Sequence, residues 1–225
     1  FDKTGGALAN AFALNGEKLA VAYSLGGSIL WQAEALDKGF AGQHCTWRFK
    51  KISDASDPSY TSTAEAAPGY NDSGWQTVTV PHDWSIRNSF NASSPSTYEG
   101  GYLDGGDAWY RTSFEVPQAL RTKRTLLYFD GVYMECRVWL NGTELGKNCN
   151  GYNPFWFDVT DKLVDGINYL SVFVRNQQPS SRWYSGSGIY RPVYLLGTEK
   201  AGFAADGLVV SFPHLETEHD TTVQT

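Results

Sequence analysis

Positive charge is scarce in this sequence and is nowhere concentrated. The chain has 18 Lys and Arg residues against 24 Asp and Glu residues, which gives a net charge of −6. Because nucleic-acid-binding proteins gather Lys and Arg into patches that neutralise phosphates, we expect no nucleic-acid partner. Charged residues make up only 19% of the chain, so the surface must rely on Ser, Thr, Asn, Gln and Gly. That composition favours an extracellular, periplasmic or cell-surface location and a neutral ligand such as a sugar.

Long apolar runs are also missing. A helix that crosses a bilayer needs about 20 mostly apolar residues, and no such stretch occurs, so we expect no membrane span. The sequence shows neither an initiating Met nor a signal peptide, and we interpret Phe1 as a processed terminus or a cut end.

Cysteine is limited to Cys45, Cys136 and Cys149. An odd number allows at most one disulfide and leaves a free thiol. Cys136 falls in a strand pattern, where a buried free thiol is expected. If a disulfide forms, Cys136 and Cys149 are the pair best placed to make it, because a predicted hairpin joins their segments. No zinc-type Cys and His spacing occurs, and we expect neither a metal nor a cofactor.

Long helical patterns are absent as well, which excludes an α/β barrel within this chain. Short alternating segments recur instead, roughly every 10 to 15 residues, with turn residues between them. Strands are predicted over residues 46–50, 76–80, 110–116, 125–129, 135–140, 143–147, 155–159, 168–175, 193–196 and 207–212, with one or two more over 19–25. Asn141-Gly142 is a strong signal for a two-residue hairpin turn. The predicted fold class is all-β, a sandwich or jelly roll.

The chain divides into three parts by composition. Residues 1–40 are rich in Gly and Ala and form an unassigned extension. Residues 41–198 hold the main strand series and are expected to form one domain. Residues 199–225 begin with a boundary and continue with one strand pattern and a polar tail, which predicts the first strands of a second, incomplete domain.

Aromatic and charged residues gather in three predicted loops, over residues 81–84, 98–102 and 180–191. Aromatic rings stack on the C–H face of a pyranose, while carboxylates and guanidinium groups hydrogen-bond its hydroxyls. The three loops are therefore the candidate sugar-binding surface.

A catalytic set is not recognisable. His82 has no accompanying Ser or Cys nucleophile motif, so it is a weak candidate for a general base. Asp83 and Glu99 could be proposed as the carboxylate pair of a glycosidase. Both lie in loops and neither ends a barrel strand, so we expect no catalytic residue in this chain.

Several of these residues have structural interpretations. Asp83 follows Pro-His and can equally cap a turn. Trp109 and Trp139 occupy strand positions, which predicts core packing. Arg191 is interpreted as one half of a buried ion pair that holds its loop. Gly186 and Gly188 are interpreted as positions that need positive φ or close packing.

An ordered series of motifs resembles the N-terminal sugar-binding domain of glycoside hydrolase family 2, over roughly residues 45–198. The series runs Gly74-Trp75, Val80-Pro81-His82-Asp83-Trp84-Ser85, Trp109-Tyr110-Arg111, Phe129-Asp130-Gly131-Val132, Val138-Trp139-Leu140-Asn141-Gly142, Gly151-Tyr152, Phe157-Asp158-Val159-Thr160 and Gly188-Ile189-Tyr190-Arg191-Pro192-Val193. The likeness is greatest to bacterial β-galactosidases, and β-glucuronidases and β-mannosidases share the fold.

The resemblance implies a jelly-roll sandwich, followed by an immunoglobulin-like domain whose first strands occupy residues 199–225. It also implies a later catalytic (β/α)₈ barrel that carries the two glutamates of a retaining mechanism. The implied partners are a β-galactoside or related sugar, the remaining domains of the parent enzyme and, for the whole enzyme, a second copy in a homo-oligomer.

The resemblance further implies that loops of this domain form the rim of the sugar pocket. The candidate substrate-binding residues are Asp83, Trp84, Glu99, Gly100, Arg182, Trp183 and Tyr184. Gly100 stands about where the best-known members carry an Asn, and Arg182-Trp183 about where they carry an acidic residue. Asp83 and Arg182 are the leading candidates.

Three functions remain open from the sequence. The chain is either a non-catalytic domain of a β-galactosidase-type enzyme, a free-standing carbohydrate-binding module or lectin, or a purely structural domain that packs on a barrel. The incomplete tail argues against the free-standing module.

Overall fold

The computed structural model describes residues 47–52, 63–180 and 186–198, together with the backbone of short strands between residues 12 and 35. Those short strands are β1 (Phe12–Asn15), β2 (Lys18–Val21), β3 (Ser24–Leu25), β4 (Ser28–Ile29) and β5 (Trp31–Ala35). The predicted strand over residues 207–212, the expected second domain over 199–225 and Cys45 lie outside the described residues.

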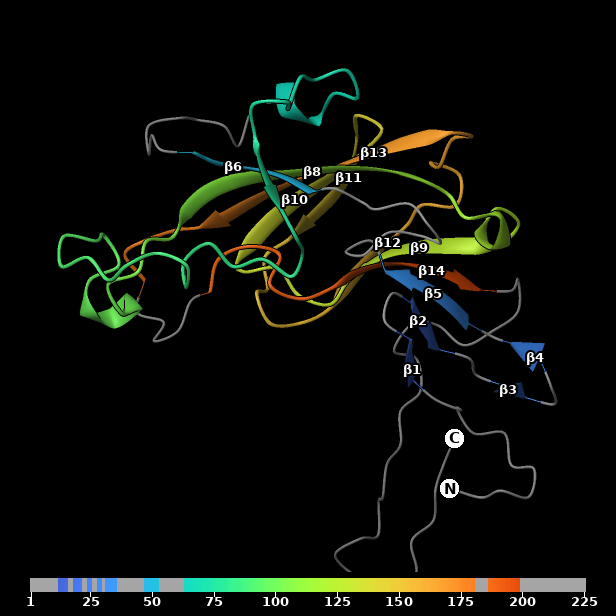
Figure 1. Cartoon of the computed structure of the whole chain (residues 1–225), viewed down its shortest axis with the longest axis horizontal. Helices are drawn as coiled ribbons and strands as arrows, with labels where there is room; N and C mark the ends of the chain where they lie inside the picture. Colours follow the sequence, from blue (N-terminus) through green and yellow to red (C-terminus); the bar gives the residue numbers. More distant parts are fainter. Residues whose placement is uncertain are drawn as a thin grey trace, which may run out of the picture.

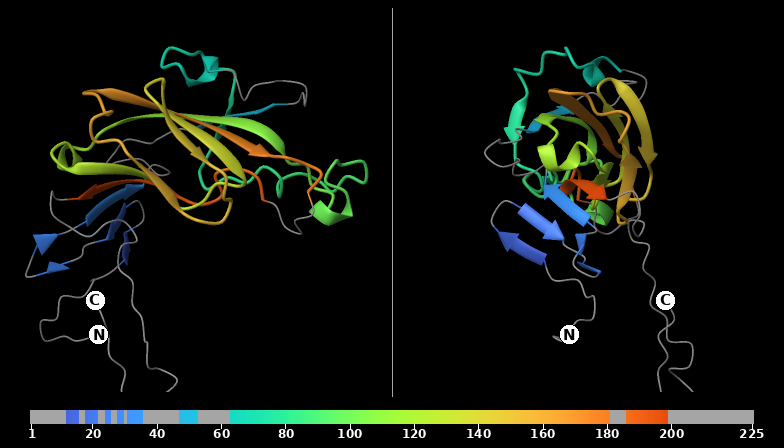
Figure 2. Two further views of the ribbon diagram at one scale, coloured as in Figure 1. Left: turned by 180° about the vertical axis from the view of Figure 1, so that it is seen from behind. Right: turned by 90° about the vertical axis from the view of Figure 1, so that its right-hand side faces the viewer.

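The main body is a sandwich of two antiparallel sheets (Figures 1 and 2). The larger sheet has the order β11-β10-β13-β8-β6-β7. Its strands are β6 (Trp47–Ile52), β7 (Gln76–Val78), β8 (Gly106–Glu115), β10 (Glu135–Leu140), β11 (Thr143–Asn148) and β13 (Ile167–Asn176). The all-β sandwich expected from the strand pattern is confirmed.

The smaller sheet has the order β12-β9-β14-β5. It consists of β12 (Phe155–Asp158), β9 (Arg124–Phe129), β14 (Val193–Thr198) and the N-terminal β5. Three single 3₁₀ turns complete the described elements: η1 (Ala64–Ala66), η2 (Tyr98–Gly100) and η3 (Gln118–Leu120).

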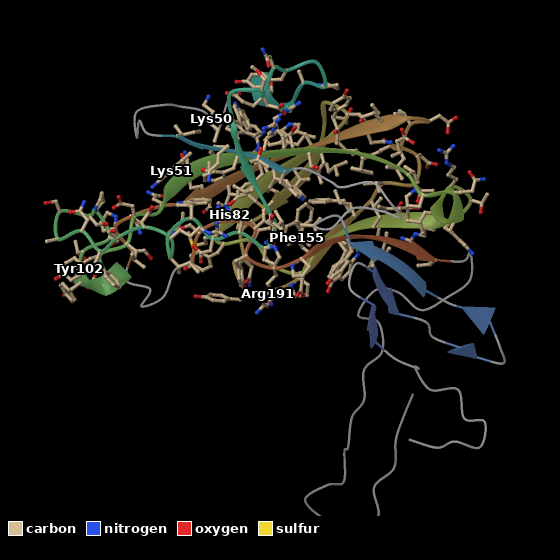
Figure 3. All side chains as sticks on the ribbon, viewed as in Figure 1. Lys50, Lys51, His82, Tyr102, Phe155 and Arg191 are labelled. Carbon is tan, nitrogen blue, oxygen red and sulfur yellow. The ribbon has the colours of Figure 1, made fainter. Side chains whose placement is uncertain are left out.

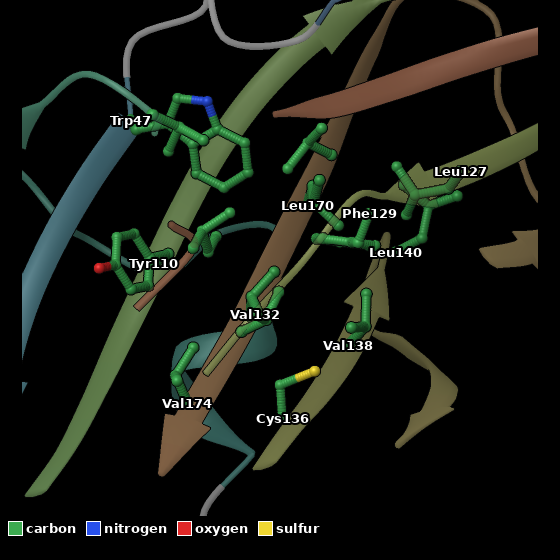
Figure 4. Close-up of a cluster of buried hydrophobic side chains, with 14 of the residues drawn as sticks. Trp47, Tyr110, Leu127, Phe129, Val132, Cys136, Val138, Leu140, Leu170 and Val174 are labelled. Carbon is green, nitrogen blue, oxygen red and sulfur yellow. The ribbon is translucent and has the colours of Figure 1, made fainter. Parts of the chain in front are cut away.

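The main core lies between the two sheets, because alternate residues of each strand point to opposite faces. On β8 the Tyr110 side chain faces this core, and on β13 Leu170 and Val174 do the same (Figure 4). Leu127 and Phe129 meet them from β9 of the smaller sheet, and every one of these five side chains is fully buried.

A second, smaller core covers the outer face of the larger sheet. Trp109, Trp139 and Phe173 point outward from β8, β10 and β13, yet each is at most 2% exposed. Ala66 and Trp75, from the segment before β7, pack over them. The core role expected for Trp109 and Trp139 is therefore confirmed.

Arg111 holds this covering segment in place. Its guanidinium donates to Asp72 Oδ2 at 2.9 Å, to the Glu65 carbonyl oxygen and to Ser171 Oγ at 2.9 Å. The side chain is only 3% exposed, so these bonds satisfy a buried charge. The segment is thus tied to the sheet by a paired cation as well as by apolar packing.

Local turn chemistry places the predicted hairpin correctly. Asn141 and Gly142 have φ angles of 53° and 81°, the two positive values that a type I′ turn needs, and they join β10 to β11.

Cys136, on β10, is a buried free thiol, and burial raises its pKa to about 12. Cys149 is free and exposed, so the disulfide alternative is wrong.

Candidate functional site: a polar junction at one end of the sandwich

Two long connections leave the sandwich at the same end. β8 begins and β13 ends there, because Gly106 pairs with Asn176 in the antiparallel ladder. The chain before β8 contains Asp83, Trp84, Glu99 and Gly100, and the chain after β13 leads to Ser187 and β14. One connection leads into β8 and the other leaves β13. The two connections that contain the sequence-predicted sugar-binding residues therefore join the sheet at neighbouring strands.

Asp83 joins the two connections. One carboxylate oxygen, Oδ1, accepts hydrogen bonds from the backbone N–H groups of Ser85 at 2.9 Å, Ile86 at 3.2 Å and Ser187 at 3.0 Å. The first two bonds cap a turn within its own loop, and the third crosses to the other connection. Asp83 is 7% exposed, so its turn-capping role is confirmed, and a direct sugar contact stays a prediction.

Backbone bonds reinforce the link. The Trp84 N–H donates to the Ser187 carbonyl oxygen at 2.9 Å, and the His82 N–H donates to the Ile189 carbonyl oxygen at 2.7 Å. The Trp84 indole N–H donates to the Gly105 carbonyl oxygen at 3.0 Å, and its ring is 4% exposed. Trp84 is thus part of the junction's interior in this structure.

Buried hydroxyl and amide groups fill the space between the segments. The Ser85 hydroxyl donates to the Asp104 carbonyl oxygen at 2.8 Å and lies 2.5 Å from Ser187 Oγ, which also accepts a bond of 2.7 Å from Asn176 Nδ2. The Gln178 side chain bonds to the backbone on both sides of Asp104. Its Oε1 accepts from the Gly105 N–H at 2.7 Å, and its Nε2 donates to the Leu103 carbonyl oxygen at 3.1 Å. We call residues 82–86, 103–105, 176–178 and 187–189 the polar junction.

A buried pair lies beneath the junction. His82 Nδ1 is 2.8 Å from the Tyr110 hydroxyl, and both side chains are nearly inaccessible. Burial, and then the positive charge of Arg87, lowers the pKa of His82 to about 4. Burial also raises the pKa of Tyr110 well above its usual value, so at neutral pH the phenol keeps its proton and the imidazole is uncharged. A buried, neutral His82 bonded to a phenol has a structural role here.

Gly188 allows the two connections to approach this pair. Its φ angle is +125°, and a Cβ atom there would overlap the Tyr110 hydroxyl and lie 2.5 Å from the His82 carbonyl oxygen. Gly188 also exchanges two backbone hydrogen bonds with Tyr133. The expectation that Gly188 supplies positive φ and close packing is confirmed.

Residues 86–102, which we call the end lobe, project beyond the junction. Figure 3 shows Tyr102 out on this lobe and His82 close to the body of the sandwich. Glu99 and Gly100 belong to the lobe's single 3₁₀ turn, with Glu99 exposed and Gly100 partly buried. A Cβ atom at Gly100 would lie 2.6 Å from Ser96 Cβ, so the tight local packing explains why glycine occupies this position.

The remaining predicted residues divide into two groups. Arg182, Trp183 and Tyr184 lie outside the described residues. Arg191 is only partly buried and donates to the carbonyl oxygens of Asp130 at 3.4 Å and Tyr152 at 3.3 Å. The buried ion pair expected for Arg191 is therefore wrong, because its guanidinium is held by backbone carbonyl groups.

Sequence reasoning missed the residues that build the junction from the second connection. Asn176, Gln178 and Ser187 have no distinctive local pattern, and Ser and Gln are common loop residues. Their one signal was their position: Asn176 ends β13, Gln178 follows two residues later, and Ser187 directly precedes Gly188. That signal becomes informative only when the pairing of β13 with β8 is known.

Among the described residues, no three His, Cys, Asp or Glu side chains are grouped so that they could hold a metal ion. Within those residues no helix has the length and apolar character needed to cross a membrane.

The fold is a β-sandwich of two antiparallel sheets with two connections tied together at one end. Residues 44–199 match the family model described as glycosyl hydrolases family 2, sugar binding domain. The chain belongs to this family, as an N-terminal sugar-binding domain.

Two relatives illustrate the range of named activities. A β-galactosidase of Bacteroides ovatus is 47% identical over 135 residues, which is 59% of this chain and 16% of the relative. A putative β-glucuronidase of Formosa agariphila is 40% identical over 149 residues, or 66% of this chain and 14% of the relative. The chain thus spans less than a fifth of the length of these relatives.

Solved structures agree with the family assignment. A family 2 glycosyl hydrolase from Bacteroides cellulosilyticus matches with a TM-score of 0.67 and 30% identity, over 80% of this chain and 22% of that one. A β-glycosidase from Bacteroides vulgatus matches with a TM-score of 0.59 and 39% identity, over 67% of this chain and 19% of that one.

Proposed function

We propose that this chain is the non-catalytic N-terminal domain of a retaining β-glycosidase and that its end loops form part of the rim of the sugar pocket. The sugar is a β-galactoside or a closely related glycoside. Catalysis belongs to a barrel elsewhere in the parent polypeptide, which would carry the two glutamates of the retaining mechanism.

The observation that carries this proposal is the polar junction. It fixes the starting points of the two connections that contain the candidate sugar contacts, through the Asp83 carboxylate and the Ser85–Ser187 hydroxyl pair. A binding rim needs such a rigid base, because contacts must be held in place before the ligand arrives. The net charge of −6 and the small number of Lys and Arg residues are compatible with a neutral glycan as the ligand.

The substrate class rests on the relatives. One is named a β-galactosidase and another a putative β-glucuronidase. Among the candidate residues, Glu99 is exposed and Arg182 stands in the second connection, so these two are our leading direct contacts. Asp83 is better explained as a positioning residue, because its Oδ1 already accepts three backbone hydrogen bonds.

The test uses the full-length parent enzyme and a nitrophenyl β-galactoside. Glu99→Gln and Arg182→Gln are expected to raise KM or lower kcat/KM while the unfolding midpoint stays constant. Asp165→Asn is the control, since Asp165 is a 99% exposed carboxylate beside the start of β13, remote from the junction. If KM and kcat/KM are unchanged in both Glu99→Gln and Arg182→Gln, the rim role is contradicted and a purely structural domain is favoured.

A further inference from the structure

The outer face of the smaller sheet presents a row of three aromatic side chains. Tyr128 on β9 pairs directly with Trp156 on β12 and with Tyr194 on β14. The residues that flank each of them in sequence, such as Leu127 and Phe129, pack in or against the main core. Because successive side chains of a strand point to opposite faces, the three rings point away from the core, on the side of the sandwich that β12, β9 and β14 form in Figure 1.

Trp156 is the exposed member of this row. Its ring lies parallel to that of Tyr128, with 8° between the planes and 6.0 Å between the centroids. β12 is at the edge of the sheet, so Tyr128 supports the indole from the one neighbouring strand that the sheet order of the described residues gives it. The indole is still 39% exposed. Trp156 is therefore held in a fixed orientation while part of its ring stays accessible.

A charged pair lies beside the row on the same face. Asp158 is two residues beyond Trp156 on β12, which is about 7 Å along the strand. Its Oδ2 accepts a hydrogen bond of 2.9 Å from Arg124 Nε, on neighbouring β9. The side chains of Arg124 and Asp158 are 56% and 46% exposed. We call Trp156, Arg124 and Asp158 the edge site.

The edge site has the groups that bind a pyranose. An exposed indole stacks on the C–H face of the sugar ring. A guanidinium has five N–H donors, so Arg124 can bind a sugar oxygen while its Nε holds Asp158. The carboxylate accepts hydrogen bonds from hydroxyl groups. Because the two charges balance each other, the pair suits a neutral sugar better than an anionic one.

Other roles explain less of this arrangement. Cross-strand aromatic pairs stabilise a sheet, but that role requires neither an exposed ring nor a charged pair beside it. The centres of protein interfaces are depleted of charged residues, whereas Arg124 and Asp158 stand next to Trp156. A ligand with both an apolar face and hydroxyl groups matches the whole set.

We propose that the edge site binds a neutral pyranose unit of a polysaccharide, without catalysis and separately from the end loops. Trp156 stacks on the sugar, Arg124 and Asp158 bind its hydroxyl groups, and Tyr128 positions the indole. The polar junction is built at the ends of β8 and β13 in the larger sheet, whereas the edge site belongs to β9 and β12. The proposal does not depend on the proposed function, because such a site would hold a polymer whichever bond the parent enzyme cleaves.

The experiment is affinity electrophoresis of the full-length protein, in the cold, in native gels that contain a soluble polysaccharide. The neutral polymers are β-1,4-galactan, galactomannan, arabinoxylan and dextran, and polygalacturonate is the anionic comparison. Trp156→Ala removes the stacking ring, and Trp156→Phe keeps a smaller one. Tyr169→Ala is the matched control: Tyr169 is a partly buried aromatic residue of β13 that precedes the core residue Leu170, so it faces outward from the other sheet.

At least one neutral polymer is expected to retard the wild-type protein. The dissociation constant for that polymer should rise about fivefold or more in Trp156→Ala, by less in Trp156→Phe and not at all in Tyr169→Ala. The proposal is overturned if no neutral polymer retards the protein, if polygalacturonate alone does so, or if Trp156→Ala and Tyr169→Ala bind equally well.

Arg124→Gln keeps the result decisive if Trp156→Ala does not fold, since it leaves all three rings in place. It is expected to weaken binding of the same polymer about fivefold, because the sugar oxygens lose a charged donor. Unfolding midpoints in urea identify the variants that are folded. Wild-type affinity in folded Arg124→Gln and folded Trp156→Phe together overturns the proposal.

Glu99→Gln separates the edge site from the sugar pocket. It is expected to keep the wild-type retardation, and Trp156→Ala is expected to keep wild-type turnover of a nitrophenyl β-galactoside, because a small substrate does not need the edge site. Retardation that is lost in Glu99→Gln but kept in Trp156→Ala would place the polymer at the end loops and overturn the proposal. Absence of turnover in the wild type contradicts the proposed function alone.

Discussion

The Asp83 carboxylate accepts the backbone N–H of Ser187 at 3.0 Å, across 104 residues of sequence. This single bond links the loop before β8 to the segment before β14. The two loops that contain the candidate sugar contacts are thereby fixed relative to each other, and the junction can be tested by removing its parts one at a time.

Asp83→Ala is expected to destabilise the domain by about 3 kcal/mol, because buried N–H groups lose a charged acceptor. Asp83→Asn keeps an oxygen at the same position and should lose less. Urea unfolding of the two variants and the wild type measures both effects. Equal stability of wild type and Asp83→Ala would mean that Asp83 is not a positioning residue.

Gly188→Ala is expected to lower the free energy of unfolding by roughly 3 kcal/mol or more, because overlap with buried atoms adds to the cost of positive φ. Gly166→Ala is the control, since Gly166 has a φ angle of +88° but a Cβ there meets nothing within 4 Å. Its expected cost is about 1 kcal/mol, from the backbone conformation alone. Similar losses in both variants would show that the space at Gly188 is not restrictive.

His82 predicts a pH dependence of stability. Its pKa is about 4 in the folded protein and near 6.5 when unfolded, so between these values the unfolded state binds the extra proton. The contribution of His82 is complete above pH 6.5 and falls as the pH drops toward 4, by up to about 1.4 kcal/mol per pH unit. Denaturant unfolding between pH 7 and pH 4.5 should show a shallower decline in His82→Gln. Parallel curves would contradict the shifted pKa.

Arg111→Lys is expected to destabilise the domain by about 2 kcal/mol or more, because an ammonium cannot reproduce the bonds that the buried guanidinium makes to its three partners. Arg124→Lys provides the comparison, since Arg124 pairs with Asp158 at 2.9 Å where both side chains are about half exposed. That exposed pair should change stability by less than about 1 kcal/mol. Thermal unfolding of both variants distinguishes the two environments.

The strands that depend on local pattern were predictable from the sequence. β10, the Asn141-Gly142 turn and β11 follow from alternation and turn chemistry, and the structure places β10 on the predicted residues. The start of β8 was not predictable in this way. Its first four residues, 106–109, begin with the second of two adjacent glycines, and they are held in the strand by pairing with β13 and by the Asp107–Arg175 ion pair at 2.6 Å.

The site was predictable only as a set of loops. The Pro-His-Asp-Trp motif identified Asp83 and Trp84, but sequence could not show that the Trp84 ring is buried and its indole N–H bonded to Gly105. Ser187 and Asn176 were missed because their importance depends on a contact between distant segments. Burial and long-range hydrogen bonds, unlike turns, are properties of the folded chain.

The most direct test of the central claim compares turnover of a nitrophenyl β-galactoside by the isolated chain and by the full-length polypeptide. Hydrolysis is expected from the full-length polypeptide and not from residues 1–225 alone, because the catalytic carboxylates are proposed to belong to another domain. Hydrolysis by the isolated chain at a comparable rate would contradict the claim.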